Sequence, residues 1–258
     1  MFNTLLYEVK DGVCTITFNR PDVFNAFNDE ISYEFQDALK KAEQDENIRV
    51  VVLTGAGKAF CSGQDLKAIA GQNRNLSESL QKRYNPIIRR MRNMPKPIVC
   101  RLNGVAAGAG CSMALACDII VAAEEAVLIE VFVNVGLVLD SGSSYFLPRL
   151  VGSVRAFELA TLAEKVSAKQ AYQWGMINKV VPMAELDNAV KYYTDKYAVA
   201  PTKAIALMKR MLNKSFQSDL DTMLDYEMYC QEIAGNSEDY KEGVNAFNEK
   251  RKPVFKGK

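Results

Sequence analysis

The sequence contains no histidine. This absence excludes the Ser-His-Asp triad, the Cys-His dyad and the usual histidine-containing zinc sites. Any acid–base catalysis must therefore come from Asp, Glu, Lys, Tyr or Cys side chains. The phosphate-binding pattern GxxxxGK[ST] is also missing, and so is any cluster of metal ligands. We therefore expect no metal and no nucleotide cofactor.

Strong charge of one sign and long apolar runs are lacking as well. The formal net charge is +1, which indicates neither nucleic acid nor a membrane as a partner. The opening MFNTLLYEVKDG has no basic segment and no apolar run of the kind found in targeting signals, and no stretch has the length of a membrane span. We expect a cytoplasmic protein. The 258 residues suit one large domain, or one domain with an appendage.

The six cysteines form no CxxC pair. Most of them lie within apolar runs, so we expect reduced thiols that pack as small hydrophobic side chains. They are Cys14, Cys61, Cys100, Cys111, Cys117 and Cys230.

Strand and helix patterns alternate along the first 181 residues. Asp11 and Gly12 form a turn between two strands, and Asn28 is placed to cap the first helix. The predicted strands cover residues 5–9, 14–18, 48–53, 98–102, 118–123 and 180–181, and the predicted helices cover residues 31–42, 108–117 and 143–150. This alternation is typical of an α/β fold with largely parallel pairing.

From residue 183 onwards the pattern is helical, with a break at Pro201. Such a tail either mediates oligomerisation or forms a layer that closes its own core, and the sequence leaves both open. The polar segment 71–79 is the best candidate for a mobile loop, and it could gate a site.

Two glycine-rich turns, at residues 54–66 and 103–118, each follow a strand and lead into a helix. Gly108 and Gly110 allow the backbone to approach a ligand, and the N–H of Ala109 between them is placed to bind an oxyanion. The N–H of Gln64 in the first turn offers a matching donor. One such donor contributes roughly 3–4 kcal/mol to transition-state stabilisation. The alternative is that both segments are only tight turns.

Six segments resemble the crotonase (enoyl-CoA hydratase/isomerase) superfamily and cover nearly the whole chain in the family's order. They are NRPDVFNAF at 19–27, AFCSGQDL at 59–66, NGVAAGAGCSMALACD at 103–118, GLVLDSGSSYFLPRLVG at 136–152, WGMINKVV at 174–181 and EKRKPVFKGK at 249–258.

The resemblance implies an α/β crotonase-like spiral of ββα units followed by a C-terminal helical region. On this basis residues 1–195 form the core for acyl-CoA binding and catalysis, and residues 196–258 form a helical region for oligomerisation and for covering CoA. Family members assemble as homotrimers or dimers of trimers. Their substrate is an acyl-CoA thioester, so CoA is part of the substrate and no separate cofactor is implied.

The resemblance also carries site residues onto this sequence. The oxyanion-hole donors match the backbone N–H groups of Gln64 and Ala109. The CoA-binding positions match Phe24, Ala26, Ser62, Asp65, Leu66, Lys67 and, in the closing segment, Phe255.

The two glutamates of the family's hydratases are replaced here by Ser112 and Phe132. Adding water to a double bond usually needs such a pair. Asp140 lies where one branch of the family's isomerases carries an acid, and the local sequence resembles Δ3-Δ2-enoyl-CoA isomerases and ring-1,2-epoxyphenylacetyl-CoA isomerase. A single carboxylate can remove a proton at C2 and return one at C4.

Asp140 also has a simpler interpretation as a helix N-cap, because DSGSS precedes a short helix. If Leu137, Val138, Leu139 and Phe146 surround it, its pKa is raised.

Among the other acids, Glu130 is offset by two residues from the missing glutamate, which keeps the same face of a strand and allows a secondary role. Glu124 and Glu125 are expected in a solvated turn, and Asp118 is expected to brace a loop.

The Ser112 and Phe132 replacements favour the first of three functions, and the other two are alternatives. The first is an enoyl-CoA isomerase that uses Asp140, acting on unsaturated fatty acyl or aromatic-ring CoA thioesters. The second is an enoyl-CoA hydratase, of fatty-acid or phenylacetate degradation, with relocated catalytic groups. The third is a non-catalytic member of the fold that binds acyl-CoA or associates with RNA.

Overall fold

A largely parallel six-stranded sheet forms the body of the protein. The computed structural model describes residues 2–71 and 74–258. The strands run in the order β1 (Leu5–Lys10), β2 (Val13–Phe18), β3 (Val50–Gly55), β5 (Ile98–Leu102), β7 (Ile119–Ala123) and β10 (Lys179–Val181). Only the β1–β2 hairpin is antiparallel. The prediction of an α/β fold with largely parallel pairing is confirmed.

A second, four-stranded sheet lies beside the first. Its order is β4 (Ala59–Cys61), β6 (Val105–Ala107), β8 (Val127–Ile129) and β9 (Val166–Ser167). Consecutive strands β3 and β4, β5 and β6, and β7 and β8 alternate between the two sheets, and helices separate the pairs. This repetition is the ββα spiral. The sequence patterns missed the second sheet because strands of two or three residues show no periodicity.

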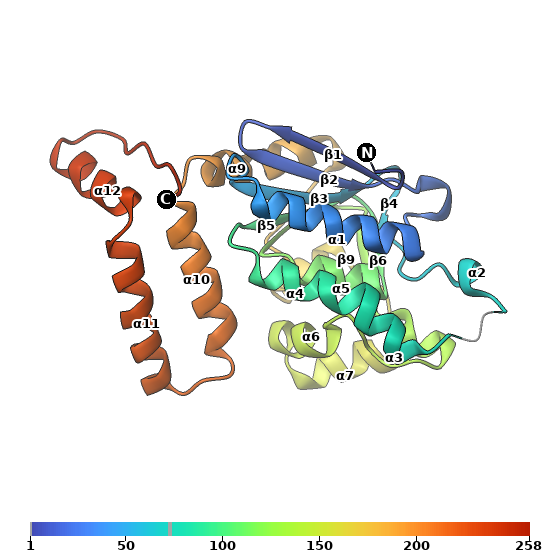
Figure 1. Ribbon diagram of the computed structural model, residues 1–258. Coiled ribbons are helices and arrows are strands. Elements are labelled where there is room, and N and C mark those ends of the chain that lie inside the picture. Colours follow the sequence, from blue (N-terminus) through green and yellow to red (C-terminus); the bar gives the residue numbers. More distant parts are fainter. Residues whose placement is uncertain (1, 72–73) are drawn as a thin grey trace.

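Helix α1 (Asp29–Gln44) and helix α4 (Asn85–Asn93) pack side by side against the sheet (Figure 1). Asn28 Oδ1 accepts a hydrogen bond of 3.1 Å from the Ile31 N–H, so the predicted cap is confirmed. Phe35, on the buried face of α1, packs edge-to-face on Phe18 with ring centroids 5.0 Å apart.

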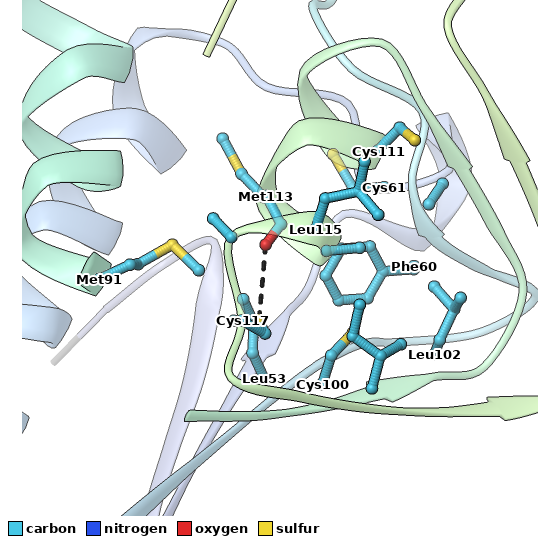
Figure 2. Close-up of a cluster of buried hydrophobic side chains, with 14 of the residues drawn as sticks. Leu53, Phe60, Cys61, Met91, Cys100, Leu102, Cys111, Met113, Leu115 and Cys117 are labelled. Atoms are coloured by element: carbon cyan, nitrogen blue, oxygen red, sulfur yellow. Dashed lines mark hydrogen bonds between the residues drawn. The ribbon is translucent and has the colours of Figure 1, made fainter. Parts of the chain in front are cut away.

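The cysteines are all buried, and none forms a disulfide. Figure 2 shows Cys61, Cys100, Cys111 and Cys117 among Leu53, Phe60, Met91, Leu102, Met113 and Leu115. Burial raises the pKa of the Cys61 thiol to about 12. These thiols therefore behave as small hydrophobic side chains, as predicted.

Helix α9 (Leu186–Ala198) covers one face of the large sheet, where Leu186, Ala189 and Val190 pack on Val50, Val52, Val99 and Val121. Helices α10 (Thr202–Ser215), α11 (Leu220–Gly235) and α12 (Glu238–Asn248) extend from one end of the molecule (Figure 1). The helical region thus begins with a layer that closes its own core. The division at residue 195 falls inside α9 and stays a prediction.

Helix α10 is attached to the core by a buried ion pair. Lys209 Nζ lies 2.7 Å from Asp118 Oδ2 and also donates to the carbonyl oxygen of Met91 at 2.8 Å. The Ile98 N–H donates to the same Asp118 oxygen at 2.8 Å. Asp118, which was expected to cap or brace the glycine loop, instead joins α10 to the beginning of β5.

The remaining helical elements are short. They are η1 (Pro21–Val23), α2 (Leu66–Ile69), α3 (Leu76–Ser79), η2 (Leu80–Tyr84), α5 (Ala109–Leu115), η3 (Val131–Val135), α6 (Ser143–Val151), α7 (Ser153–Leu162), α8 (Ala168–Gln173) and η4 (Met183–Glu185). The loop predicted at 71–79 is wrong for Leu76–Ser79, which is helical, while residues 72–73 lie outside the described residues. Within the described part of the chain, no helix combines the length and hydrophobicity needed to span a bilayer.

Candidate active site

In the turn after β4, the Gln64 N–H points away from Phe27, the residue with which Gln64 pairs. Gln64 pairs with Phe27 in an isolated parallel bridge. Phe27 forms both hydrogen bonds of this bridge with the neighbours of Gln64: its N–H donates to Gly63 at 2.7 Å, and its carbonyl accepts from Asp65 at 2.9 Å. Because a parallel bridge uses only these neighbours on the opposite strand, the N–H of Gln64 itself points to the other side.

The second donor lies at the beginning of α5. Ala109 is the first residue of this helix, so its N–H has no acceptor within the helix. Gly108 precedes it with φ 52° and ψ −125°, a backbone conformation that side-chain-bearing residues avoid. The positive end of the helix dipole therefore faces the same point as this free N–H.

The two turns touch each other. A Cβ atom at Gly63 would lie 2.8 Å from the Ala107 carbonyl oxygen and 3.5 Å from the Ala109 nitrogen. A Cβ atom at Gly110 would lie 2.2 Å from the Cys61 carbonyl oxygen. Both glycines are required for this close approach, which brings the Gln64 and Ala109 segments together as the sequence predicted.

Tyr84, which the sequence analysis missed, fixes the Gln64 side chain. Its phenolic group donates to Gln64 Oε1 at 2.8 Å, while Gln64 Nε2 donates to the Phe27 carbonyl oxygen at 2.8 Å. Tyr84 is 3% exposed and ends the π-helical turn η2. Single π turns interrupt helices mainly at functional sites, but no sequence pattern marks them.

The segments predicted to bind CoA lie next to each other at this edge. The Ser62 N–H donates to the Phe24 carbonyl oxygen at 3.0 Å, which joins the first motif to the second. Phe24 adopts a left-handed conformation with φ 52° and is 57% exposed, and Leu66 is 51% exposed. Ala26, Asp65 and Lys67 belong to the same two segments. Two exposed apolar side chains on adjoining segments suit the nonpolar parts of a CoA molecule.

The Asp65 carboxylate already forms an ion pair and a hydrogen bond within the protein. Arg20 Nη2 lies 3.0 Å from Asp65 Oδ2, and Oδ1 accepts from the Ala68 N–H at 3.1 Å as the cap of α2. Although burial opposes ionisation, these hydrogen bonds lower the pKa of Asp65. The residue therefore shapes the loop, and its carboxylate is not free to bind a ligand.

Phe255 lies elsewhere in the protomer. Its ring packs against Gly243 of α12, at the opposite end of the molecule from α2 (Figure 1). The fold of one protomer does not bring Phe255 to the other predicted CoA-binding residues.

Asp140 lies on the loop before α6. Its Oδ1 accepts from the Ser141 hydroxyl at 2.8 Å, and its backbone carbonyl accepts from Ser112 Oγ at 3.1 Å. Ser112 is one turn beyond Ala109 in α5. Burial raises the pKa of Asp140, and the Ser141 hydrogen bond partly offsets this increase.

Two expectations about Asp140 need correction. Its side chain does not cap α6, because Gly142 is the N-cap residue and the cap has no side-chain hydrogen bond. The predicted increase in its pKa is confirmed, but Val138 is 82% exposed and does not enclose the carboxyl group.

Glu124 and Glu125 are exposed, as predicted, whereas Glu130 is 3% exposed.

An apolar cavity of about 630 Å³ lies between α6 and α10, lined by residues such as Leu115, Phe146 and Met208. It does not border Gln64, Ala109 or Asp140. The candidate site consists of two N–H donors, which can stabilise an enolate oxygen, and a carboxyl group, which can take up the proton whose removal forms the enolate.

Residues 8–258 match the family model for enoyl-CoA hydratase/isomerase. The chain belongs to the crotonase superfamily. It is 43% identical, over the full length of both proteins, to 1,2-epoxyphenylacetyl-CoA isomerase of Escherichia coli. It is 33% identical to short-chain-enoyl-CoA hydratase of Clostridium acetobutylicum, over 97% of this chain and 96% of that relative.

The crystal structure of enoyl-CoA hydratase from Bacillus anthracis superposes with a TM-score of 0.94 at 33% identity, covering 99% of this chain and all of that chain. The crotonase fold predicted from the sequence is thus confirmed, and the protein is an acyl-CoA enzyme of this family. The assignments of the oxyanion-hole, CoA-binding and catalytic residues remain predictions.

Proposed function

We propose that this crotonase-superfamily protein is an enoyl-CoA isomerase that moves a double bond from C3 to C2 with Asp140 as its single base. The observation that carries the proposal is the position of Asp140. Its backbone is hydrogen-bonded to Ser112 in the helix that begins with the Ala109 donor. The two hydratase glutamate positions hold Ser112 and Phe132, neither of which has a group that ionises near neutral pH and could serve as a general acid or base.

In the proposed reaction the Asp140 carboxylate removes a proton from C2. The electron pair of the broken C–H bond moves into the thioester and yields a dienolate. The negative charge on the thioester oxygen is stabilised by the N–H groups of Gln64 and Ala109. The protonated Asp140 then returns the proton to C4, which leaves the double bond between C2 and C3.

The environment of Asp140 suits this role. Burial raises its pKa, and a carboxylate with a raised pKa is a stronger base towards a carbon acid while it remains ionised near neutral pH. The backbone donors do not titrate, so they stabilise the dienolate over the whole pH range.

The similarity to 1,2-epoxyphenylacetyl-CoA isomerase favours isomerisation, with fatty acyl or aromatic-ring CoA thioesters as the substrate class. A hydratase is the second candidate. It is favoured by the relative named short-chain-enoyl-CoA hydratase and by the presence of a second buried acid, Glu130. The carboxyl group of Asp140 argues against a non-catalytic acyl-CoA-binding role.

A paired assay tests the proposal. The purified protein is incubated with 3-hexenoyl-CoA and, separately, with 2-hexenoyl-CoA, and the products are resolved by chromatography and mass. We expect the 3-enoyl substrate to convert without a change of mass and the 2-enoyl substrate to gain little water. Rapid gain of water by the 2-enoyl substrate would instead identify a hydratase.

We also propose that the protein assembles as a homotrimer or a dimer of trimers. Helices α10 and α11 and the turn between them carry apolar side chains that are more than half exposed in the protomer: Met208, Leu212, Phe216, Leu220, Leu224 and Met228. Burial of such side chains between subunits is favourable. Light scattering of the purified protein measures the mass of the assembly, and a monomer would contradict the proposal.

A further inference from the structure

Glu130 is the most deeply buried carboxyl group close to the proposed site. It follows β8 and is 3% exposed. Its Oε1 accepts a hydrogen bond of 2.8 Å from Ser143 Oγ. Its Oε2 is buried and has no hydrogen-bond partner among residues 2–71 and 74–258. The proposed reaction does not use this side chain.

The hydrogen bond from Ser143 belongs to a short buried network. The hydroxyl oxygens of Ser143 and Ser112 are 2.7 Å apart, and Ser112 Oγ also lies 3.1 Å from the Asp140 carbonyl oxygen. The Ser143 N–H donates to the same carbonyl at 3.0 Å. Glu130 is thereby linked through two hydroxyls to the backbone of Asp140.

The protonation state of Glu130 follows from this geometry. A buried carboxylate with this single accepted hydrogen bond is strongly disfavoured, whereas the neutral acid can reverse the bond and donate its O–H to Ser143 Oγ. Burial raises the pKa of Glu130 to about 7, an effect that the Ser143 hydrogen bond and the adjacent Cys111 thiol oppose and the charge of Asp140 reinforces. Cys111 and Asp140 are the titratable groups facing it from α5 and from the loop before α6.

We infer that Glu130 is a positioning residue that acts as a neutral acid, holding Asp140 against α5 through Ser143 and Ser112. The inference rests on the proposed role of Asp140 as the base. In the neutral state the Glu130 O–H donates to Ser143 Oγ, Ser143 donates to Ser112 Oγ, and Ser112 donates to the Asp140 carbonyl oxygen. This chain keeps the Asp140 backbone in register with the helix that provides the Ala109 donor.

Ionisation of Glu130 would reverse this contribution. An ionised Glu130 can only accept, so Ser143 must donate to Glu130 and Ser112 must donate to Ser143. The Asp140 carbonyl oxygen then loses its hydrogen bond from Ser112. Activity should therefore fall as Glu130 loses its proton.

Two substitutions separate this role from that of a proton donor. Gln has nearly the same shape as the neutral acid and can donate its amide N–H to Ser143 Oγ, but it carries no titratable proton. Glu130→Gln should therefore retain most of the wild-type kcat, while Glu130→Leu should lower kcat by about tenfold to a hundredfold with little change in KM, because it displaces the base. Glu125→Gln and Glu125→Leu, at an exposed position five residues earlier, are matched controls and should behave like wild type.

The contact itself is tested by a double-mutant cycle. Ser143→Ala should lower kcat about as much as Glu130→Leu, and the double variant should lower it no further, because both changes break the same link. Additive losses would overturn the proposed link.

The pH profile provides the readout that a purely structural role would not change. With 3-hexenoyl-CoA as substrate, wild-type kcat should decline above about pH 7, and Glu130→Gln should lack this decline. An unchanged decline in Glu130→Gln, or a loss of kcat in Glu130→Gln as large as in Glu130→Leu, would overturn the inference. This comparison remains decisive if Glu130→Leu fails to fold.

Failure of the proposed function gives a different result. If Asp140→Asn keeps its activity, Asp140 is not the base, and the proposed function fails. If Asp140→Asn is inactive while every Glu130 variant matches wild type at all pH values, the function stands and only the role of Glu130 is wrong.

Discussion

The phenolic group of Tyr84 and the side-chain carbonyl of Gln64 are joined by a hydrogen bond of 2.8 Å. This bond anchors the residue whose backbone N–H is the proposed oxyanion donor. Tyr84→Phe removes the phenolic O–H and leaves the part-buried Gln64 Oε1 without its hydrogen-bond donor. Loss of such a hydrogen bond costs about 1–2 kcal/mol. We expect kcat to fall several-fold with a smaller change in KM.

Steady-state kinetics on 3-hexenoyl-CoA measure this effect. Tyr33→Phe is the control, because Tyr33 is 47% exposed on α1. A Tyr84→Phe enzyme with unchanged kcat would mean that the Gln64 backbone keeps its position without the hydrogen bond from Tyr84 to the Gln64 side chain.

Asp140→Asn should abolish isomerisation and leave binding of the CoA thioester almost intact. The amide keeps the size of the carboxyl group but cannot accept a proton from C2, and loss of a general base typically costs 10²–10⁴-fold. Turnover and calorimetric binding are measured on the same preparation. A variant that keeps most of its turnover would contradict the role of Asp140.

Gly63→Ala should distort the oxyanion hole. The new Cβ atom would lie 2.8 Å from the Ala107 carbonyl oxygen, and the φ of 89° is itself unfavourable for alanine. Displacement of one oxyanion donor costs about 3 kcal/mol, so kcat should fall by about a hundredfold. Gly175→Ala is the matched control, since Gly175 has φ 76° and open space at the Cβ position. Equal effects at the two glycines would point to backbone strain alone.

Glu130 should make the protein less stable as the pH rises. Its pKa is raised from 4.5 to about 7 in the folded protein, so the folded state holds this proton more tightly than the unfolded chain. The resulting stabilisation, about 3 kcal/mol, is complete below pH 4.5 and is lost as the pH rises to about 7. Urea unfolding at several pH values should show this slope in wild type and a smaller one in Glu130→Gln. Parallel curves for the two proteins would exclude the contribution of Glu130.

Lys209→Met should loosen helix α10. Lys209 is 7% exposed, and it pairs with Asp118 and donates to two backbone carbonyls. Loss of one partner of a buried ion pair costs roughly 3–5 kcal/mol. The free energy of unfolding in urea measures the loss, and Lys203→Met, at an exposed position of the same helix, provides the reference. Equal stabilities of the two variants would show that packing alone holds α10.

Much of the architecture was determined by local sequence. The alternation of apolar residues, the Asp11-Gly12 turn and the Asn28 cap are short-range features, so the large sheet and α1 could be predicted from them. The absence of histidine excluded histidine-based catalysis, and the two glycine turns indicated Gln64 and Ala109, whereas Asp140 was identified only through the resemblance to the crotonase superfamily.

Tertiary structure alone decided the rest, because the remaining contacts join segments far apart in the chain. Tyr84 reaches Gln64 across 20 residues, and Ser143 reaches Glu130 across 13 and Ser112 across 31. The short strands of the second sheet and the burial of Glu130 likewise depend on packing between turns of the spiral. No local pattern encodes such contacts, since burial and hydrogen-bond geometry arise only when distant segments meet.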